Sequence, residues 1–288
     1  MAAIAVDLSP ASPVGVLVTG SLLSGAARLR RSVAMVEASE NDGVHQVRVS
    51  CRRLRSDLRL FRRLLGGDQV VLLRKELSQL AMSCSQARDL EVVSTLIRDN
   101  ATGEDDADYV ATILHLLATS LTRAVAGAED AVASQRTAML LDLLDAVAAA
   151  PELRARADRP CGKVLPRLLA STQAKFTAAA DQLTAWSPDQ QWHDVRLDAK
   201  RLRYAAESMS RVLGEEAKEI AARAAKFQEL IGQHQDHCAA ADTLWLFLDE
   251  ADRLGDVEMG FALGRLMERH RAARRPLRDE FLALYHRD

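Results

Sequence analysis

The sequence predicts an all-α protein, and three observations support this fold class. Aromatic residues make up only 4% of the chain, whereas β-rich proteins favour aromatic and β-branched side chains. Ala, Leu and Arg are frequent, and all three are good helix formers. Apolar residues recur at helical spacing in nearly every segment, with no alternating strand pattern of useful length. With 48% hydrophobic and 27% charged residues in 288, the chain has the composition of a core-forming globular protein.

Short runs of Gly, Pro, Ser and Asn separate the predicted helices. Gly66-Gly67, Gly214, Gly232 and Gly255 are expected to cap or interrupt helices, because glycine adopts the conformations that end them. Ser187-Pro188 is a start signal, with Ser at the cap and Pro at the first helical position. These boundaries predict helices at 14–39, 43–66, 70–99 with a break near Ser83, 106–133, 135–149, 162–185, 189–213, 215–231, 234–253 and 256–285.

The chain divides near its middle into two related halves. The segment 151–160 is polar and contains Pro and Arg, and it separates halves of about 14–150 and 160–288. An offset of 148 residues maps a motif of the first half onto the second. We therefore expect one domain over 14–288, built as two related helical bundles about a pseudo-twofold axis. Residues 1–13 lack the basic leader of a signal peptide and are expected to form a disordered or extended lead-in.

One motif of basic residues occurs once in each half. It reads His-x-x-Arg-x-x-x-(Arg/Lys)-Arg-Leu-Arg. Its basic members are His45, Arg48, Arg52, Arg53 and Arg55 in the first copy and His193, Arg196, Lys200, Arg201 and Arg203 in the second. From position 48 to 63 there are seven arginines and one acid, although the whole chain has a formal charge of −2. The local field, rather than the net charge, is therefore the useful quantity.

Each copy separates a basic helix face from an apolar one when residues are placed at about 100° intervals. In the first copy the basic face, here called the basic stripe, contains His45, Arg48, Arg52, Arg55, Arg59, Arg62 and Arg63. The apolar face contains Val47, Cys51, Leu54, Leu58, Phe61 and Leu65. In the second copy His193, Arg196, Lys200 and Arg203 oppose Val195, Ala199, Leu202, Ala206 and Met209. The second stripe is shorter, because Glu207 stands where the first copy has Arg59.

Two readings of this stripe compete. Charged helix faces usually meet solvent. However, few acids are placed to pair with the first stripe, so its arginines repel one another. Arg outnumbers Lys, and its forked guanidinium suits phosphate oxygens. Because the spacing also recurs in the other half, a polyanion-binding surface is the favoured interpretation.

The sequence gives little support for a metal site. The four cysteines are widely spaced and form no Cys-x-x-Cys pair, which suits free thiols in a reducing cytoplasm. His234, Asp236 and His237 form a small cluster, but helical pairs of this spacing are common. His45 and His193 each precede an Arg by one turn, so either could donate to a phosphate when protonated. We expect no metal and no cofactor.

The duplicated motif, followed in its second copy by Tyr204, resembles that of the CHAD domain, the conserved histidine α-helical domain. Arg88-Asp89 and Leu230-Ile231-Gly232 with Asp236 support the resemblance, which spans about 17–281. Cys84 departs from the glycine common before Arg-Asp, and His234-Gln235 is also atypical. The resemblance implies two pseudo-symmetric four-helix bundles whose basic surface crosses a central pore and binds inorganic polyphosphate.

The same resemblance implies the residues of the binding site. Carried over by position, the contacts are His45, Arg48, Arg52, Arg55, His193, Arg196, Lys200 and Arg203, with Arg88 and Lys226 on the following helices as weaker candidates. Arg53, Arg59 and Arg201 belong to the motif or its stripe and complete the expected set.

Three functions follow from a basic helical surface. The favoured one is non-catalytic polyphosphate binding in the cytoplasm, with targeting to polyphosphate granules as one role. The first alternative is binding to an RNA or DNA backbone, although scarce aromatics disfavour base stacking and nothing supplies base readout. The second is a polyphosphate or triphosphate hydrolase. The Glu-x-Glu-x-Lys signature of triphosphate-cleaving tunnel domains, which often accompany CHAD domains, is absent from the sequence. No carboxylate cluster suited to Mg²⁺ is present either, so we expect no catalysis. No stretch approaches 18 uncharged apolar residues bounded as a membrane span, so no membrane partner is expected.

Overall fold

The computed structural model describes residues 8–40, 42–101 and 107–287, and its regular structure is helical. No strand occurs among these residues beyond two isolated β-bridges, which confirms the predicted all-α fold class. The helices are α1 (Val14–Glu37), α2 (Gly43–Leu60), α3 (Asp68–Ser83), α4 (Ser85–Asn100), α5 (Ala107–Ala133), α6 (Gln135–Ala149), the short 3-10 helix η2 (Ala155–Asp158), α7 (Cys161–Ala180), α8 (Asp189–Leu213), α9 (Glu215–Leu254) and α10 (Val257–Tyr285).

The chain folds into two compact units, each assembled from three stretches of sequence. Unit 1 contains residues 1–86, 125–176 and 200–224, and unit 2 contains residues 87–124, 177–199 and 225–288. The two related bundles and the pore expected from the sequence remain predictions.

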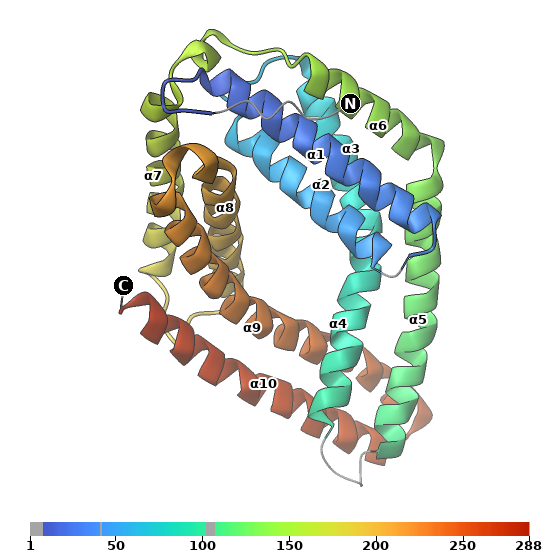
Figure 1. The fold of residues 1–288 in the computed structure, drawn as a ribbon. Coiled ribbons are helices and arrows are strands. Elements are labelled where there is room, and N and C mark those ends of the chain that lie inside the picture. The colour runs from blue at the N-terminus through green and yellow to red at the C-terminus, as the bar shows by residue number, and fades with distance from the viewer. Residues whose placement is uncertain (1–7, 41, 102–106, 288) are drawn as a thin grey trace. The chain divides into compact units, whose positions relative to one another are not determined.

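In unit 1, α1 and α2 lie side by side, α1 also contacts α6, and α3 packs against both α2 and α6 (Figure 1). Leu22 and Leu29 of α1 and Leu54 of α2 are almost completely buried in this core. The two helices approach closely at Gly25, where an added Cβ atom would lie 2.3 Å from Cδ2 of Leu54. Glycine is therefore required there by packing rather than by backbone conformation.

The segment before α1 is attached to the start of α7. Ser9 and Ser12 form a turn, and the backbone N–H groups of Cys161 and Gly162 donate to the carbonyls of Ser12 and Pro10, each over 2.8 Å. Residues 8–13 of the expected lead-in are thus held by backbone hydrogen bonds. Residues 1–7 of that expectation lie outside the described residues.

Unit 2 has a core of apolar side chains from four helices. They are Val93 and Ile97 of α4, Val110, Ile113 and Leu117 of α5, Ala240, Leu244 and Ala251 of α9, and Met259, Leu263, Leu266 and Met267 of α10. A group of rings adds to it. Phe281 contacts Trp192 and Phe227 edge to face, with ring centroids 5.4 Å apart in both pairs. Such pairs contribute beyond the area they bury.

Helix α5 has the length and apolar composition of a membrane span, and it is the one such helix among the described residues. Its Val110, Ile113 and Leu117 belong to the core of unit 2. Only 22% of its most apolar window is buried, so most of that window faces outward. A single helix of this kind is weak support for membrane insertion.

Most predicted helix boundaries agree with the structure to within two residues, and three do not: the break at Gly232, the end of α7 and the end of α2. The break expected near Ser83 is confirmed, because α3 ends there and α4 begins at Ser85. The break expected at Gly232 is wrong, since α9 continues through it as one helix of 40 residues. A helical glycine costs only about 1 kcal/mol relative to Ala, and the buried neighbours Ile231 and His234 hold the helix together.

The other two errors concern the ends of α7 and α2. Helix α7 ends at Ala180 and not near Ala185. Helix α2 ends at Leu60 and not near Gly66. The chain turns there because Gly66 N–H and Leu64 C=O pair with the backbone of Glu152 and Arg154, over 2.8 and 2.9 Å.

Candidate functional site: a basic surface on α2 and α8

Helix α2 holds the first copy of the motif with its apolar face turned inward. Val47, Cys51, Leu54 and Leu58 are completely buried, so the predicted apolar face is confirmed. On the opposite side, Arg48 and Arg52 are half-buried, whereas Arg55 and Arg59 are exposed. His45 lies in the first turn of the helix and is half-buried.

Two arginines expected in the basic stripe are not on the helix. Arg62 and Arg63 follow the end of α2 and lie in the turn that leads to Leu64. The helical wheel does not apply beyond Leu60, so their placement on the same face was wrong. The stripe on α2 therefore ends at Arg59.

Helix α8 brings part of the second copy against the first within unit 1. Its residues 200–213 belong to that unit, and Nη2 of Arg52 lies 3.5 Å from the hydroxyl of Tyr204. Arg53 lies 5.5 Å above the Tyr204 ring and 3.2 Å from a carboxylate oxygen of Glu207. Basic residues from both copies, including Lys200, Arg201 and Arg203, therefore belong to one compact unit.

Positive charge exceeds negative charge along this contact. Glu207 accepts from Nε of Arg203 over 2.7 Å and pairs with Arg53, so one carboxylate serves two guanidinium groups. Nε of Arg52 is buried and meets no hydrogen-bond acceptor among the described residues. An unsatisfied buried donor is unfavourable, so this atom is suited to an incoming acceptor. Arg48 donates from Nε to Oγ of Ser85 over 3.1 Å.

The remaining motif residues belong to unit 2. Nδ1 of His193 lies 3.2 Å from Oε1 of Gln235, and Nε2 of Gln235 donates to the carbonyl of Asp189 over 3.4 Å. Because an amide oxygen only accepts, a hydrogen bond between them needs the tautomer with a proton on Nδ1 of His193. Arg196 lies beside Gly232, where an added Cβ atom would be 3.8 Å from its Nε.

The two weaker candidates, Arg88 and Lys226, are also in unit 2. Arg88 on α4 donates to a carboxylate oxygen of Glu91 over 2.7 Å, as a pair one turn apart. Lys226 is exposed on α9. Arg88 is thus partly neutralised by its own helix.

Sequence reasoning missed a charged network around Asp189 in unit 2. Arg274 donates to Asp189 over 2.6 Å, Arg278 pairs with the same carboxylate, and Arg278 Nε lies 2.9 Å from Nε2 of His234. Burial, followed by the charge of Arg278, lowers the pKa of His234 to about 4. His234 is therefore neutral near pH 7 and accepts from Arg278. The i, i+4 spacing of Arg274 and Arg278 was the available sequence signal.

This network includes the donor atoms of a possible metal site. One ligand atom each from Asp189, His234 and Cys238 lies within 4.8 Å of the others. All three residues already accept a hydrogen bond from a guanidinium group, because Arg274 also donates to Sγ of Cys238 over 3.4 Å. A cation would have to compete with the positive charges of both arginines, so the arrangement fits a structural ion-pair network better than a metal site.

The expected cluster of His234, Asp236 and His237 divides between different partners. His237 Nδ1 lies 3.0 Å from Nδ1 of His270, whereas His234 faces Arg278. Burial lowers the pKa of both His237 and His270, the latter to about 4. Neutral imidazoles can share one proton between the facing nitrogens.

The chain is helical, and a basic motif that begins with a histidine occurs twice on its helices. Together these two features define a class of protein. The sequence profile of the CHAD domain matches residues 22–245, so the chain belongs to the CHAD domain family. The structure resembles the crystal structure of the CHAD domain from the plant Ricinus communis, with a TM-score of 0.80 and 22% identity over 99% of this chain and 96% of that one.

It also resembles PptA from Streptomyces chartreusis, with a TM-score of 0.77 and 23% identity over 96% of this chain and all of that one. Two sequence relatives are the uncharacterized proteins MT2285 and Rv2226 of Mycobacterium tuberculosis strains CDC 1551 and H37Rv, each 30% identical over 221 residues. That match covers 73% of this chain but only 41% of the relatives, so the chain spans about two fifths of their length.

Proposed function

We propose that this protein binds inorganic polyphosphate without hydrolysing it, through the basic stripe of α2 and the basic motif residues of α8, from His193 to Arg203. The observation that most supports the proposal is the setting of Arg52. Its guanidinium is half-buried between the two motif helices, and its Nε has no acceptor among the described residues. The group that its Nη2 contacts, the hydroxyl of Tyr204, is neutral. A phosphate oxygen is the acceptor whose charge and geometry suit such a group.

The chemistry of the stripe matches a polymer of phosphates. Arg48, Arg52, Arg55 and Arg59 recur every three or four residues along α2, so one helix offers a row of forked donors. Polyphosphate repeats one charged unit and carries no bases, and aromatic residues are scarce in the chain. Membership of the CHAD family supports the same ligand. Granule targeting in the cytoplasm is part of the proposal.

The test compares ligands by titration of the purified chain at two salt concentrations. Long-chain polyphosphate is expected to bind more tightly than an equal phosphate concentration of duplex DNA. Its affinity should fall steeply with salt, because each phosphate contact releases counterions. Equal affinity for DNA would favour the nucleic-acid alternative, and phosphate released in the presence of Mg²⁺ would make the protein a hydrolase.

A charge-matched pair of variants locates the binding surface. Changing Arg48, Arg52, Arg196 and Lys200 together to Ala is expected to weaken polyphosphate binding by at least a hundredfold while the far-ultraviolet circular dichroism stays helical. The control changes four exposed basic residues outside the motif, Arg74, Lys75, Lys163 and Arg167, to Ala. Both variants lose four charges, so equal loss of binding would show that net charge rather than the motif governs affinity.

A further inference from the structure

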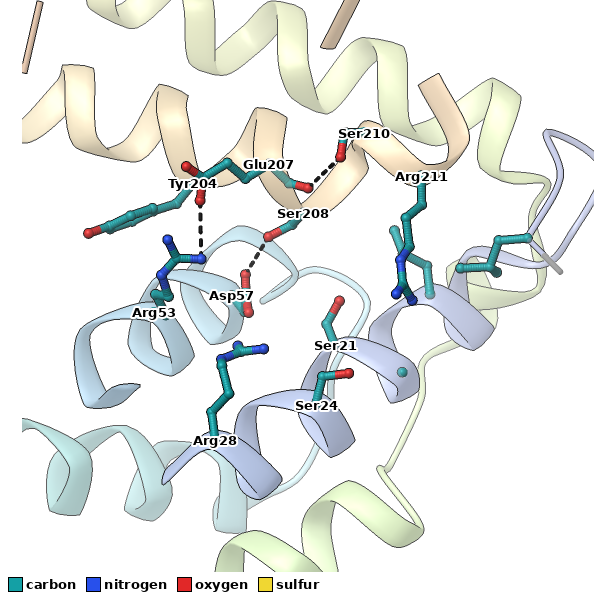
Figure 2. Close-up of a pocket in the computed structure, with 13 residues that line it drawn as sticks. Ser21, Ser24, Arg28, Arg53, Asp57, Tyr204, Glu207, Ser208, Ser210 and Arg211 are labelled. Carbon is teal, nitrogen blue, oxygen red and sulfur yellow. Dashed lines mark hydrogen bonds and ion pairs between the residues drawn. The ribbon is translucent and has the colours of Figure 1, made fainter. Parts of the chain in front are cut away.

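Unit 1 contains a second polar site, a cavity of about 270 Å³ away from the basic stripe. Helix α1 supplies Ser21, Ser24 and Arg28, and helix α2 supplies Arg53 and Asp57 from the flank opposite the stripe. Helix α8 adds Tyr204, Glu207, Ser208, Ser210 and Arg211. Figure 2 shows the labelled side chains of these three helices converging on one space.

The donors of this cavity exceed its acceptors. Nε of Arg28 is buried without an acceptor among the described residues, and no described residue hydrogen-bonds the hydroxyl of Ser21 or Ser24. Arg211 is exposed and forms no ion pair with a described residue. Both carboxylates in the wall already have partners: Ser208 donates to Asp57 over 2.8 Å, and Glu207 pairs with Arg53. The surplus of donors calls for a ligand rich in oxygen acceptors.

Asp57 adds a requirement to that ligand. Its side chain is 6% exposed and lies in the wall of the cavity. An ionised carboxylate only accepts hydrogen bonds, and it has capacity beyond the single bond from Ser208. A ligand that both accepts from Arg and Ser and donates one O–H to Asp57 would satisfy every group. Orthophosphate near neutral pH has this combination, since it keeps a proton on one oxygen, whereas sulfate does not.

We infer that this cavity binds a small protonated inorganic phosphate, with orthophosphate as the ligand. Arg28, Arg211, Ser21 and Ser24 donate to its oxygens, and Asp57 accepts from its P–O–H group. The volume is below the range of drug-sized pockets, which is about 300–1,000 Å³, and it suits a compact anion rather than a stretch of polymer. Of the motif residues only Arg53 lines this cavity, and it pairs with Glu207. The orthophosphate site therefore adjoins the polyphosphate surface proposed above, and the chain would bind both the polymer and its monomer.

The main experiment is calorimetric titration of the whole chain with orthophosphate and with sulfate, at pH 7.5 and matched ionic strength. We expect one orthophosphate per chain and at least tenfold weaker binding of sulfate. A site built to accept a ligand proton rejects an analogue that lacks it, because the buried acceptor is left unpaired. No saturable orthophosphate binding up to millimolar concentration, or equal binding of sulfate, overturns the inference.

Three variants assign the contacts. Arg211→Gln and Ser24→Ala are each expected to weaken orthophosphate binding, the first by tenfold or more. Asp57→Asn should reduce the preference for phosphate over sulfate, because the Asn amide can donate to either anion. The matched control is Arg30→Gln on the same helix, whose side chain pairs with Asp142 and Asp145 outside the cavity. A loss with Arg30→Gln equal to that with Arg211→Gln would contradict the assignment.

The two sites are separable in the same assay. The motif variant at Arg48, Arg52, Arg196 and Lys200 should lose polyphosphate and keep orthophosphate, and Arg211→Gln should do the reverse. If the chain binds orthophosphate but not polyphosphate, the inference stands and the proposed function fails. If Arg211→Gln abolishes binding of both ligands equally, the cavity is not an independent site and the inference fails.

Discussion

Asp57 shows at the scale of one residue how burial changes chemistry. Only 6% of its side chain is exposed, and burial raises the pKa of its carboxyl from 3.8 to about 6. Ser208, Arg28 and Arg53 act in the opposite direction by stabilising the carboxylate, and Glu207 adds to the rise. Desolvation is the larger effect because the group has left water, while Arg28 forms no direct ion pair with it.

The raised pKa of Asp57 predicts how the free energy of unfolding changes with pH, and stability measurements can test the direction of that change. The folded protein holds this proton more tightly than the unfolded chain, so Asp57 lowers the free energy of unfolding as pH rises from about 4 to above 6. Asp57→Asn should therefore raise the free energy of unfolding at pH 8, by at most about 3 kcal/mol, since one pKa unit corresponds to about 1.4 kcal/mol.

The gain should fall below about 1 kcal/mol at pH 4, where the folded wild type already carries the proton. Urea unfolding at both pH values measures the difference. Asp142→Asn, which changes a carboxylate whose side chain is 82% exposed, serves as the control and should stay within about 0.5 kcal/mol at both. A gain for Asp57→Asn that does not depend on pH would contradict the assignment.

At the scale of helices, the sequence predicted what depends on periodicity and missed what depends on packing. The apolar faces of both motif helices were correct, because Leu54 and Leu202 repeat at helical spacing and are buried. The end of α2 was missed because Glu152 and Arg154, about 90 residues away in sequence, provide its backbone partners. The Asp189 network was missed for the same reason: Arg274 and Arg278 reach it from α10.

Two glycines allow the effect of helix propensity and the effect of packing to be measured separately. Gly232 lies inside α9, and an added Cβ atom would meet Arg196 at an ordinary contact distance of 3.8 Å. Gly232→Ala should therefore raise the free energy of unfolding by about 0.5–1 kcal/mol, because Ala loses less conformational freedom in a helix. Gly25→Ala should lower it by about 1–3 kcal/mol, because its Cβ would lie 2.3 Å from Leu54. Urea unfolding of both variants checks the opposite signs, and the same sign for both would contradict the packing argument.

At the scale of the whole molecule, the chain passes between its two compact units only within helices. The five passages fall at 86/87, 124/125, 176/177, 199/200 and 224/225, and these positions lie inside α4, α5, α7, α8 and α9. No loop marks any of these boundaries, which is why composition and turn residues could not have revealed them. Unfolding one unit would also break helical turns that begin in the other.

We therefore expect the units to unfold together. Leu244→Ala in the core of unit 2 and Leu54→Ala in unit 1 remove side chains that are completely buried. Each should lower the free energy of unfolding by about 2–5 kcal/mol and shift one common transition. Urea titrations followed by circular dichroism and by tryptophan fluorescence should coincide in the wild type and both variants. The fluorescence reports on unit 2, because Trp186, Trp192 and Trp245 all belong to it. Two separated transitions would show independent units.

The continuity of α8 restricts how this protein can change in length. The helix is unbroken from Asp189 to Leu213, so one residue inserted between Arg196 and Lys200 would rotate everything after it by about 100°. Tyr204 and Glu207 would then leave Arg52 and Arg53, and Leu202 would leave the core. The effect of a substitution in the motif can be small or large, whereas an insertion or deletion there displaces every later residue of the helix. Packing therefore constrains the helical register of the motif. This constraint explains why the two copies of the motif align in sequence without a gap.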